Sequence, residues 1–292
     1  MRRLIVNGDD FGYTRGVNAG VLRAFREGIL TSTTLMAGGD AFEDAVCLAG
    51  QNPALGVGCH LVLVGERAVA PPDRIPTLAD RDGRLPATLA ELIGRLALGR
   101  VHQGDLETEL RAQLGRVCAA GIRPTHVDTH KHTHLYPRVM QAVARVASEF
   151  GVFAVRKPYE NLRTLLGRGE RRERGQLSRS TTAALAGLGR RGFRSLAERG
   201  GLRSPDYFWG IRWTGTLSEA DLLRALDRLA EGTTELMCHP GLHDAELDGK
   251  ATRLKAERQR ELEVLTAPRV RRAVERAGIQ LISFRELSEA HV

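Results

Sequence analysis

The sequence lacks the features that mark a membrane-spanning or disulfide-stabilised protein. Its 292 residues contain no apolar run of about 18 residues, the length that a membrane-spanning helix needs. The apolar run Leu4-Ile5-Val6 soon meets Asp9 and Asp10, so we expect no signal peptide. The four cysteines are scattered and form no C-x-x-C motif. This pattern argues against a zinc finger or a thioredoxin-type redox site, and it fits a reducing, cytoplasmic setting.

Lysine is absent from one strongly basic segment. Residues 163–203 hold 11 arginines and three acidic residues, so their net charge is 11 − 3 = +8, which equals that of the whole chain. Such a segment suits anionic lipid headgroups or nucleic acid, and a solvated insertion is the alternative. Its only aromatic residue is Phe193. Because nucleic-acid modules usually add stacking rings, we expect no nucleic-acid partner.

Short β-forming runs alternate with amphipathic helical runs along the chain. We expect strands over residues 3–7, 32–37, 55–63, 125–130, 152–157, 207–213, 233–238 and 279–284. We expect helices over residues 15–27, 40–51, 87–98, 105–120, 137–150, 218–231 and 250–277, the fourth capped by Asp105.

Seven or eight such βα units predict an α/β fold, namely an irregular TIM-like (β/α) barrel of mostly parallel strands. A doubly wound open sheet is the alternative, although no G-x-G-x-x-G motif follows the first strand to indicate a dinucleotide. We expect one domain over residues 1–292, with a basic insertion at about 160–205.

Polar residues suited to metal binding or acid–base chemistry lie at the ends of several expected strands. The first strand is followed by Asp9 and Asp10, the third contains His60, and a late strand ends at His239. Because active-site residues of βα barrels lie where strands end, we expect these side chains on one rim. Each has an ordinary alternative explanation, the aspartates and His239 as turn residues and His60 as a core residue.

The stretch 126–134 gives the strongest indication of a metal site. His126, Asp128, His130, His132 and His134 occupy alternate positions, so they would share one face of an extended segment. Stacking several imidazoles inside a barrel is costly unless a metal or hydrogen-bond partners accompany them. The pattern therefore predicts metal binding.

Four motifs together resemble the YdjC-like carbohydrate deacetylases. They are Asn7-Gly8-Asp9-Asp10-Phe11-Gly12, Gly58-Cys59-His60-Leu61, Thr125-His126-Val127-Asp128-Thr129-His130-Lys131-His132 and Cys238-His239-Pro240-Gly241. The resemblance runs in order from residue 3 to about residue 285. Taken as a whole, the sequence most resembles the hopanoid-associated subgroup of this family. Members of that subgroup are thought to deacetylate an N-acetylglucosaminyl hopanoid lipid.

The resemblance implies an irregular βα barrel that holds one divalent metal ion, with zinc preferred over magnesium. Its ligands would be Asp10, His60 and His130, with Asp9 as the general base and His239 as the acid. We expect substrate contacts from His126, His132 and His134.

The predicted function is metal-dependent removal of the acetyl group from an N-acetylglucosamine-containing carbohydrate or glycolipid. We also expect a homodimer and a cytoplasmic protein peripheral to the inner membrane face, where the amphipathic stretch 181–199 would meet anionic lipid. One alternative is a phosphoesterase with two metal ions about 3.5–4 Å apart. A glycosidase with Asp9 and Asp10 as its carboxylate pair is a less favoured alternative, because its chemistry needs neither a histidine cluster nor a metal ion. The non-enzymatic alternative is a nucleic-acid-binding protein that uses the Arg-rich segment.

Overall fold

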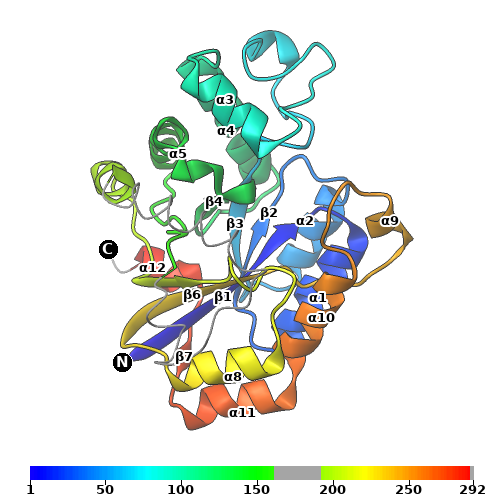
Figure 1. Cartoon of the computed structure of the whole chain (residues 1–292), viewed down its shortest axis with the longest axis vertical. Coiled ribbons are helices and arrows are strands. Elements are labelled where there is room, and N and C mark those ends of the chain that lie inside the picture. Colours follow the sequence, from blue (N-terminus) through cyan, green and yellow to red (C-terminus); the bar gives the residue numbers. More distant parts are fainter. Residues whose placement is uncertain (161–191, 290–292) are drawn as a thin grey trace, which may run out of the picture.

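The computed structural model describes residues 1–160 and 192–289, and its centre is a curled sheet (Figure 1). The strands are β1 (Arg2–Phe11), β2 (Ser32–Leu35), β3 (Gly56–Leu61), β4 (Val127–Thr129), β5 (Tyr207–Trp209), β6 (Gly232–Cys238) and β7 (Gln280–Leu281). They lie in the order β4-β3-β2-β1-β6-β5, and β7 pairs with β1. All pairings between these strands are parallel, and the sheet curls into a half-barrel. The predicted irregular TIM-like α/β fold is confirmed.

Helices surround the sheet (Figure 1). They are α1 (Arg15–Glu27), α2 (Phe42–Gly50), α3 (Leu89–Ala97), α4 (Gln103–Ala119), α5 (Pro137–Glu149), α8 (Glu219–Asp227), α9 (Ala245–Asp248), α10 (Ala256–Thr266), α11 (Pro268–Arg276) and α12 (Phe284–Glu289), with 3₁₀ turns η1 (Pro72–Arg74) and η2 (His130–Leu135). Thr14, Thr88 and Ser218 cap α1, α3 and α8 by accepting a backbone hydrogen bond. The predicted cap of α4 is wrong, because Asp105 lies inside the helix and accepts hydrogen bonds from Thr77.

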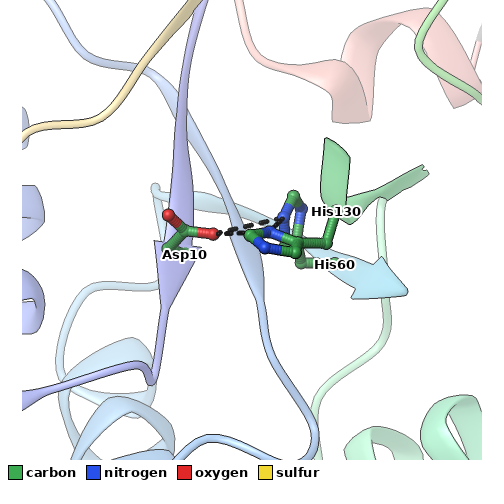
Figure 2. Close-up of side chains that lie close together, drawn as sticks. All are labelled: Asp10, His60 and His130. Atoms are coloured by element: carbon green, nitrogen blue, oxygen red, sulfur yellow. Dashed lines mark hydrogen bonds and ion pairs between the residues drawn. The ribbon is translucent and has the colours of Figure 1, made fainter. Parts of the chain in front are cut away.

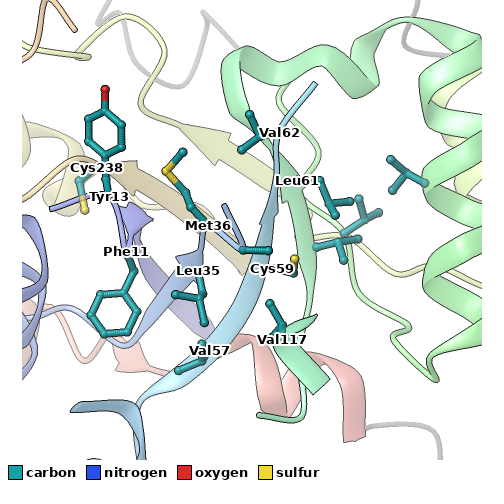
Figure 3. Packing of buried hydrophobic residues seen from close by; sticks show 14 of the residues in the cluster. Phe11, Tyr13, Leu35, Met36, Val57, Cys59, Leu61, Val62, Val117 and Cys238 are labelled. Carbon is teal, nitrogen blue, oxygen red and sulfur yellow. The ribbon is translucent and has the colours of Figure 1, made fainter. Parts of the chain in front are cut away.

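The core fills both faces of the central strands, as expected for parallel strands covered on each side. Phe11, Leu35, Val57 and Cys59 pack together beside the sheet (Figure 3). Cys59 belongs to this apolar cluster, whereas its neighbour His60 projects to the opposite face of β3, toward a cavity at the ends of the strands. The alternation of side chains along β3 thus separates packing from chemistry.

Several expected strands are shorter in the structure, among them those expected over 207–213 and 279–284, which are reduced to β5 and β7. Residues 152–157 form only isolated bridges, from Val155 to Val127 and from Ala154 to Arg203. β4 is only three residues long, so few of its backbone groups are able to hydrogen-bond to a neighbouring strand. The extended conformation also stops at Thr129, because Lys131 and His132 adopt left-handed φ angles of 53° and 54° in η2. The expected shared face from 126 to 134 is therefore wrong beyond residue 129.

The basic segment lies partly outside the described residues, which omit 161–191. The expected insertion at 160–205 and the amphipathic stretch 181–199 can thus be followed only from residue 192 onward. There Phe193 is buried and its ring lies 5.8 Å from that of His134 and 5.4 Å from that of Tyr159. Phe193 therefore belongs to the core of the protein. Within the described residues no helix has the length and apolar character needed to span a membrane.

Candidate metal and catalytic site

The parallel register brings four strand ends to one rim of the half-barrel. His60 on β3 is the register partner of Asp128 on β4, and Gly8 on β1 is the partner of Cys238 on β6. Asp9 and Asp10 therefore lie between the end of β3 on one side and His239 on the other. A cavity of about 500 Å³ opens here and is lined by Asp9, Asp10, His60, His130, His132 and His239, among others.

Three side chains converge at the floor of this cavity (Figure 2). Asp10 Oδ1 lies 3.3 Å from His60 Nε2 and 3.4 Å from His130 Nδ1, and the two imidazole nitrogens are 3.3 Å apart. The three atoms form a nearly equilateral triangle. Asp10 Oδ1 is buried and has no hydrogen-bond partner in the part of the chain that the structure describes. This group could hold one metal ion.

A local distortion of β1 places Asp10 in this position. The pairing of β1 with β2 shifts register between Gly8 and Phe11, and Asp10 has a left-handed φ of 68°. Two adjacent carboxylates on a regular strand would point to opposite sides. The distortion instead lets both Asp9 and Asp10 face the cavity. Left-handed conformations of residues other than glycine are strained and often mark functional sites.

His60 is held by a hydrogen bond on the far side of its ring. Its Nδ1 lies 2.7 Å from Asp128 Oδ1, which leaves Nε2 directed at Asp10. Metal-binding histidines commonly have such a carboxylate behind them. Burial would lower the pKa of His60, but the charge of Asp128 and the contact with Asp10 raise it to about 10. The site thus favours positive charge beside Asp10.

A second acidic group surrounds the buried Arg156. Its guanidinium donates to both oxygens of Asp9 at 2.6 Å and to Glu235 at 2.7 Å, and it forms an ion pair with Asp128 at 2.6 Å. Asp9, His60 and Asp128 also lie close enough to one another to suggest a metal site. Because Arg156 already occupies this group with a positive charge, the group of Asp10, His60 and His130 is the better candidate for a metal ion.

Two of the expected substrate-contacting histidines are structural neighbours of the site. His126 lies between Thr125 Oγ1 and Asn7 Oδ1 and stacks on Phe284. His134 contacts the Thr129 hydroxyl and the backbone oxygen of Arg156. Burial lowers the pKa of His126 to about 3 and that of His134 to about 4. Neither is among the cavity-lining residues.

His132 differs from these two histidines because it lines the cavity. Its Nδ1 is buried and has no hydrogen-bond partner within the described residues, and its ring meets the edge of Phe208. Burial lowers its pKa, and Arg156 lowers it further. A neutral imidazole at this position is able to donate or accept a hydrogen bond, so a substrate contact stays a prediction for His132.

Helix α10 contributes two site residues that the sequence gave no reason to select. Glu261 accepts a hydrogen bond from the backbone N–H of His239 at 2.6 Å, and its carboxylate lies 3.9 Å from Nδ1 of the same histidine. Arg258, three residues earlier, donates to Asp10 Oδ2 at 2.5 Å. Residues three apart share a helix face, so one turn of α10 supports both ends of the site. The only local signal is a pair of charges on a helix that packs against α1.

Comparison with known proteins gives a consistent assignment. The family model described as YdjC-like protein matches residues 3–276. A carbohydrate deacetylase from Brevibacillus brevis is 37% identical over 287 residues, covering 98% of this chain and 99% of the relative. A chitooligosaccharide deacetylase from Yersinia enterocolitica is 32% identical, with coverage of 96% and 97%.

A solved structure supports the same relationship at the level of the fold. It is an Enterococcus faecalis protein assigned to cellobiose-phosphate cleavage, with a TM-score of 0.77 and 25% identity. The match covers 98% of each chain. Family match, relatives and fold agree over nearly the whole length, and the chain therefore belongs to the YdjC-like family.

Proposed function

We propose that this protein is a metal-dependent hydrolase that removes the acetyl group from an N-acetylated sugar. The observation that carries the proposal is the triangle of Asp10 Oδ1, His60 Nε2 and His130 Nδ1, with sides of 3.3–3.4 Å. The relatives suggest the reaction, because similar proteins are named carbohydrate deacetylase and chitooligosaccharide deacetylase.

The three ligand atoms fit a divalent metal in both spacing and chemistry. Ligands about 2.0–2.1 Å from a tetrahedral zinc ion lie about 3.3–3.4 Å from one another. Two imidazole nitrogens and one carboxylate oxygen favour zinc over magnesium, which prefers an all-oxygen octahedron. The unpartnered Asp10 Oδ1 supplies the free lone pair that such a ligand needs.

Asp9 is the proposed general base. A metal bound by the three ligands would acidify its water and polarise the acetyl carbonyl. The Asp9 carboxylate lines the same cavity and accepts the proton of the attacking water. Arg156 donates hydrogen bonds to both oxygens of Asp9 and fixes the orientation of the carboxylate. Asn7 Nδ2 also donates to Asp9 Oδ1 at 3.1 Å.

His239 is the proposed acid that protonates the departing sugar amine. Its ring lines the cavity opposite His60 along the rim, and Glu261 fixes its backbone. Burial lowers the pKa of His239, whereas the charges of Glu261, Asp9 and Asp10 act in the opposite direction. Once protonated, an imidazole of lowered pKa gives up its proton readily, which suits donation to an amine leaving group.

The proposed substrates are N-acetylglucosamine conjugates, either oligosaccharides or a glycolipid. Resemblance to the hopanoid-associated subgroup supports a hopanoid lipid as the glycolipid. The basic segment 163–203 supports peripheral binding to an anionic membrane surface, and a homodimer stays a prediction.

Acetate release from N-acetylglucosamine conjugates, measured with and without a chelator, tests the function directly. We expect release by the metal-loaded enzyme, loss after chelation and recovery when zinc is restored. The screen should place soluble chitooligosaccharides beside a lipid-linked N-acetylglucosamine, because the ratio of their kcat/KM values separates the two substrate classes. Release that is unaffected by complete metal removal would contradict the proposal.

Metal stoichiometry separates deacetylation from the phosphoesterase alternative. One ion per chain is expected here, because the Arg156 guanidinium already pairs with Asp9 and Asp128 and would repel a second cation there. Two ions per chain, together with phosphate release from sugar phosphates, would favour the alternative.

A further inference from the structure

Arg258 is a buried arginine that lines the cavity beside the proposed metal site. It comes from α10 rather than from a strand end, and only 1% of its surface is exposed. Its Nη2 donates to Asp10 Oδ2 at 2.5 Å, and its Nε donates to the backbone oxygen of Leu254 at 3.2 Å. The guanidinium is thus fixed at two points, one on the backbone just before α10 and one on Asp10.

This contact makes the two oxygens of Asp10 different. Oδ2 is occupied by Arg258, whereas Oδ1 faces His60 and His130 and has no hydrogen-bond partner within residues 1–160 and 192–289. A carboxylate with both oxygens free is able to bind a cation through one or through two of them. A planar guanidinium that holds one oxygen removes this choice.

We propose that Arg258 is a positioning residue that restricts Asp10 to a single metal-binding oxygen. The open coordination positions are then kept for water and substrate. This inference rests on the proposed metal site, and it names a residue that acts through Asp10 without touching the reacting atoms.

Two glycines leave room for the Arg258 side chain, because a Cβ at either position would crowd it or the backbone beside it. A Cβ on Gly241 would lie 3.1 Å from Cδ of Arg258, and a Cβ on Gly20 would lie 2.4 Å from Cα of Gly241. The backbone N–H of Gly241 also donates to the backbone oxygen of Arg258 at 3.3 Å. The His239-Pro240-Gly241 motif thus serves two purposes, because it presents His239 to the cavity and lets Arg258 pass behind Asp10.

Cobalt substitution tests this role without relying on turnover. Tetrahedral cobalt(II) absorbs visible light more strongly than five- or six-coordinate cobalt(II), so the absorption spectrum reports how Asp10 binds. We expect Arg258→Met to weaken the visible absorption of the cobalt protein, as the freed Asp10 binds through both oxygens. Turnover of the zinc protein should fall about 10–100-fold at saturating metal, as is usual when a partner of a metal ligand is removed.

Arg260→Met is the matched control, because Arg260 lies on the same helix with an exposed side chain that pairs only with Glu257 among the described residues. It should leave both spectrum and turnover unchanged. Arg258→Lys keeps the positive charge but lacks the planar fork, so its spectrum should change in the same direction by a smaller amount. This variant keeps the test decisive if Arg258→Met does not fold.

A purely structural role predicts a different result. Arg258→Met would then melt at a lower temperature, while its folded fraction would show the wild-type cobalt spectrum. That result, or an unchanged spectrum for Arg258→Lys, would overturn the inference and leave the metal site in place. If the wild-type protein binds no cobalt, the proposed metal site itself fails.

Discussion

The two neighbouring aspartates of β1 experience opposite environments although both are buried and both contact an arginine. Asp9 belongs to a closed cluster in which Arg156 contacts both its oxygens and also reaches Asp128 and Glu235. Asp10 belongs to an open group in which one oxygen is paired with Arg258 and the other has no hydrogen-bond partner among the described residues. Buried ion-pair networks specify structure, whereas a buried carboxylate oxygen that lacks a partner and faces two imidazole nitrogens is suited to bind a metal ion.

Breaking the open group should remove function and leave the fold intact. In His130→Ala we expect metal binding and acetate release to fall to background, because the triangle loses one ligand. His130 is partly exposed, with 23% of its side-chain surface accessible, so the free energy of unfolding without metal should change little. Equilibrium dialysis and urea unfolding measure the two effects. Retained activity in a metal-free His130→Ala protein would contradict the ligand assignment.

Asp9→Asn tests whether the closed cluster also takes part in the chemistry. If Asp9 is the general base, turnover should drop by about 10²–10⁴ while the metal stays bound. Asn keeps the size of the side chain but cannot accept the proton of water. Steady-state kinetics with metal analysis on the same sample separates the two effects. Loss of the metal would show that the roles of Asp9 and Asp10 are exchanged.

Breaking the closed cluster should mainly destabilise the fold. Arg156→Met leaves Asp9, Asp128 and Glu235 buried without their cation, which should cost about 3–5 kcal/mol of the free energy of unfolding. Urea unfolding of the metal-free protein measures this loss. Arg145→Met is the control, because the Arg145 side chain is 67% exposed and solvent screens its ion pairs with Glu107 and Glu149. Equal losses for the two variants would remove the distinction drawn here.

Adding and removing zinc should change the stability of the protein only when the group of Asp10, His60 and His130 is intact. A ligand that binds only the folded state at 100 times its Kd stabilises by about 2.7 kcal/mol. We therefore expect zinc to raise the melting temperature of the wild-type protein and of Arg145→Met. It should have no effect on His130→Ala. A zinc-dependent shift in that variant would place the metal elsewhere.

The smallest expected effect concerns His126, which supports the rim through Asn7. Its pKa is lowered from 6.5 to about 3 by burial, so the unfolded chain binds more protons between these values. Stability should therefore fall as the pH is lowered from about 6.5, by about 2 kcal/mol at pH 5 for this histidine. Urea unfolding at both pH values should show a smaller loss for His126→Gln. The exposed His102→Gln should behave like the wild type.

Local pattern was enough to predict most of the strands and helices around the site. The ends of β1, β3, β4 and β6 carry the polar residues that the alternation of strands and helices marked as the rim. The conformation after Thr129 was beyond such reasoning. Alternate spacing suggested an extended strand, but two left-handed residues turn the chain there and direct His130 and His132 differently from His134.

The alternation of strands and helices by itself predicted the barrel and the rim of polar strand ends. The four motifs carried the resemblance to the family, and that resemblance implied Asp10, His60 and His130 as the ligands. Only the tertiary structure decided which carboxylate has both oxygens paired with an arginine and which keeps one oxygen open. Arg156 lies 147 residues from Asp9, and Arg258 lies 248 residues from Asp10, so no short-range sequence pattern predicts either ion pair. A buried ion pair depends on distance through space and on shared burial, which arise only when the chain has folded.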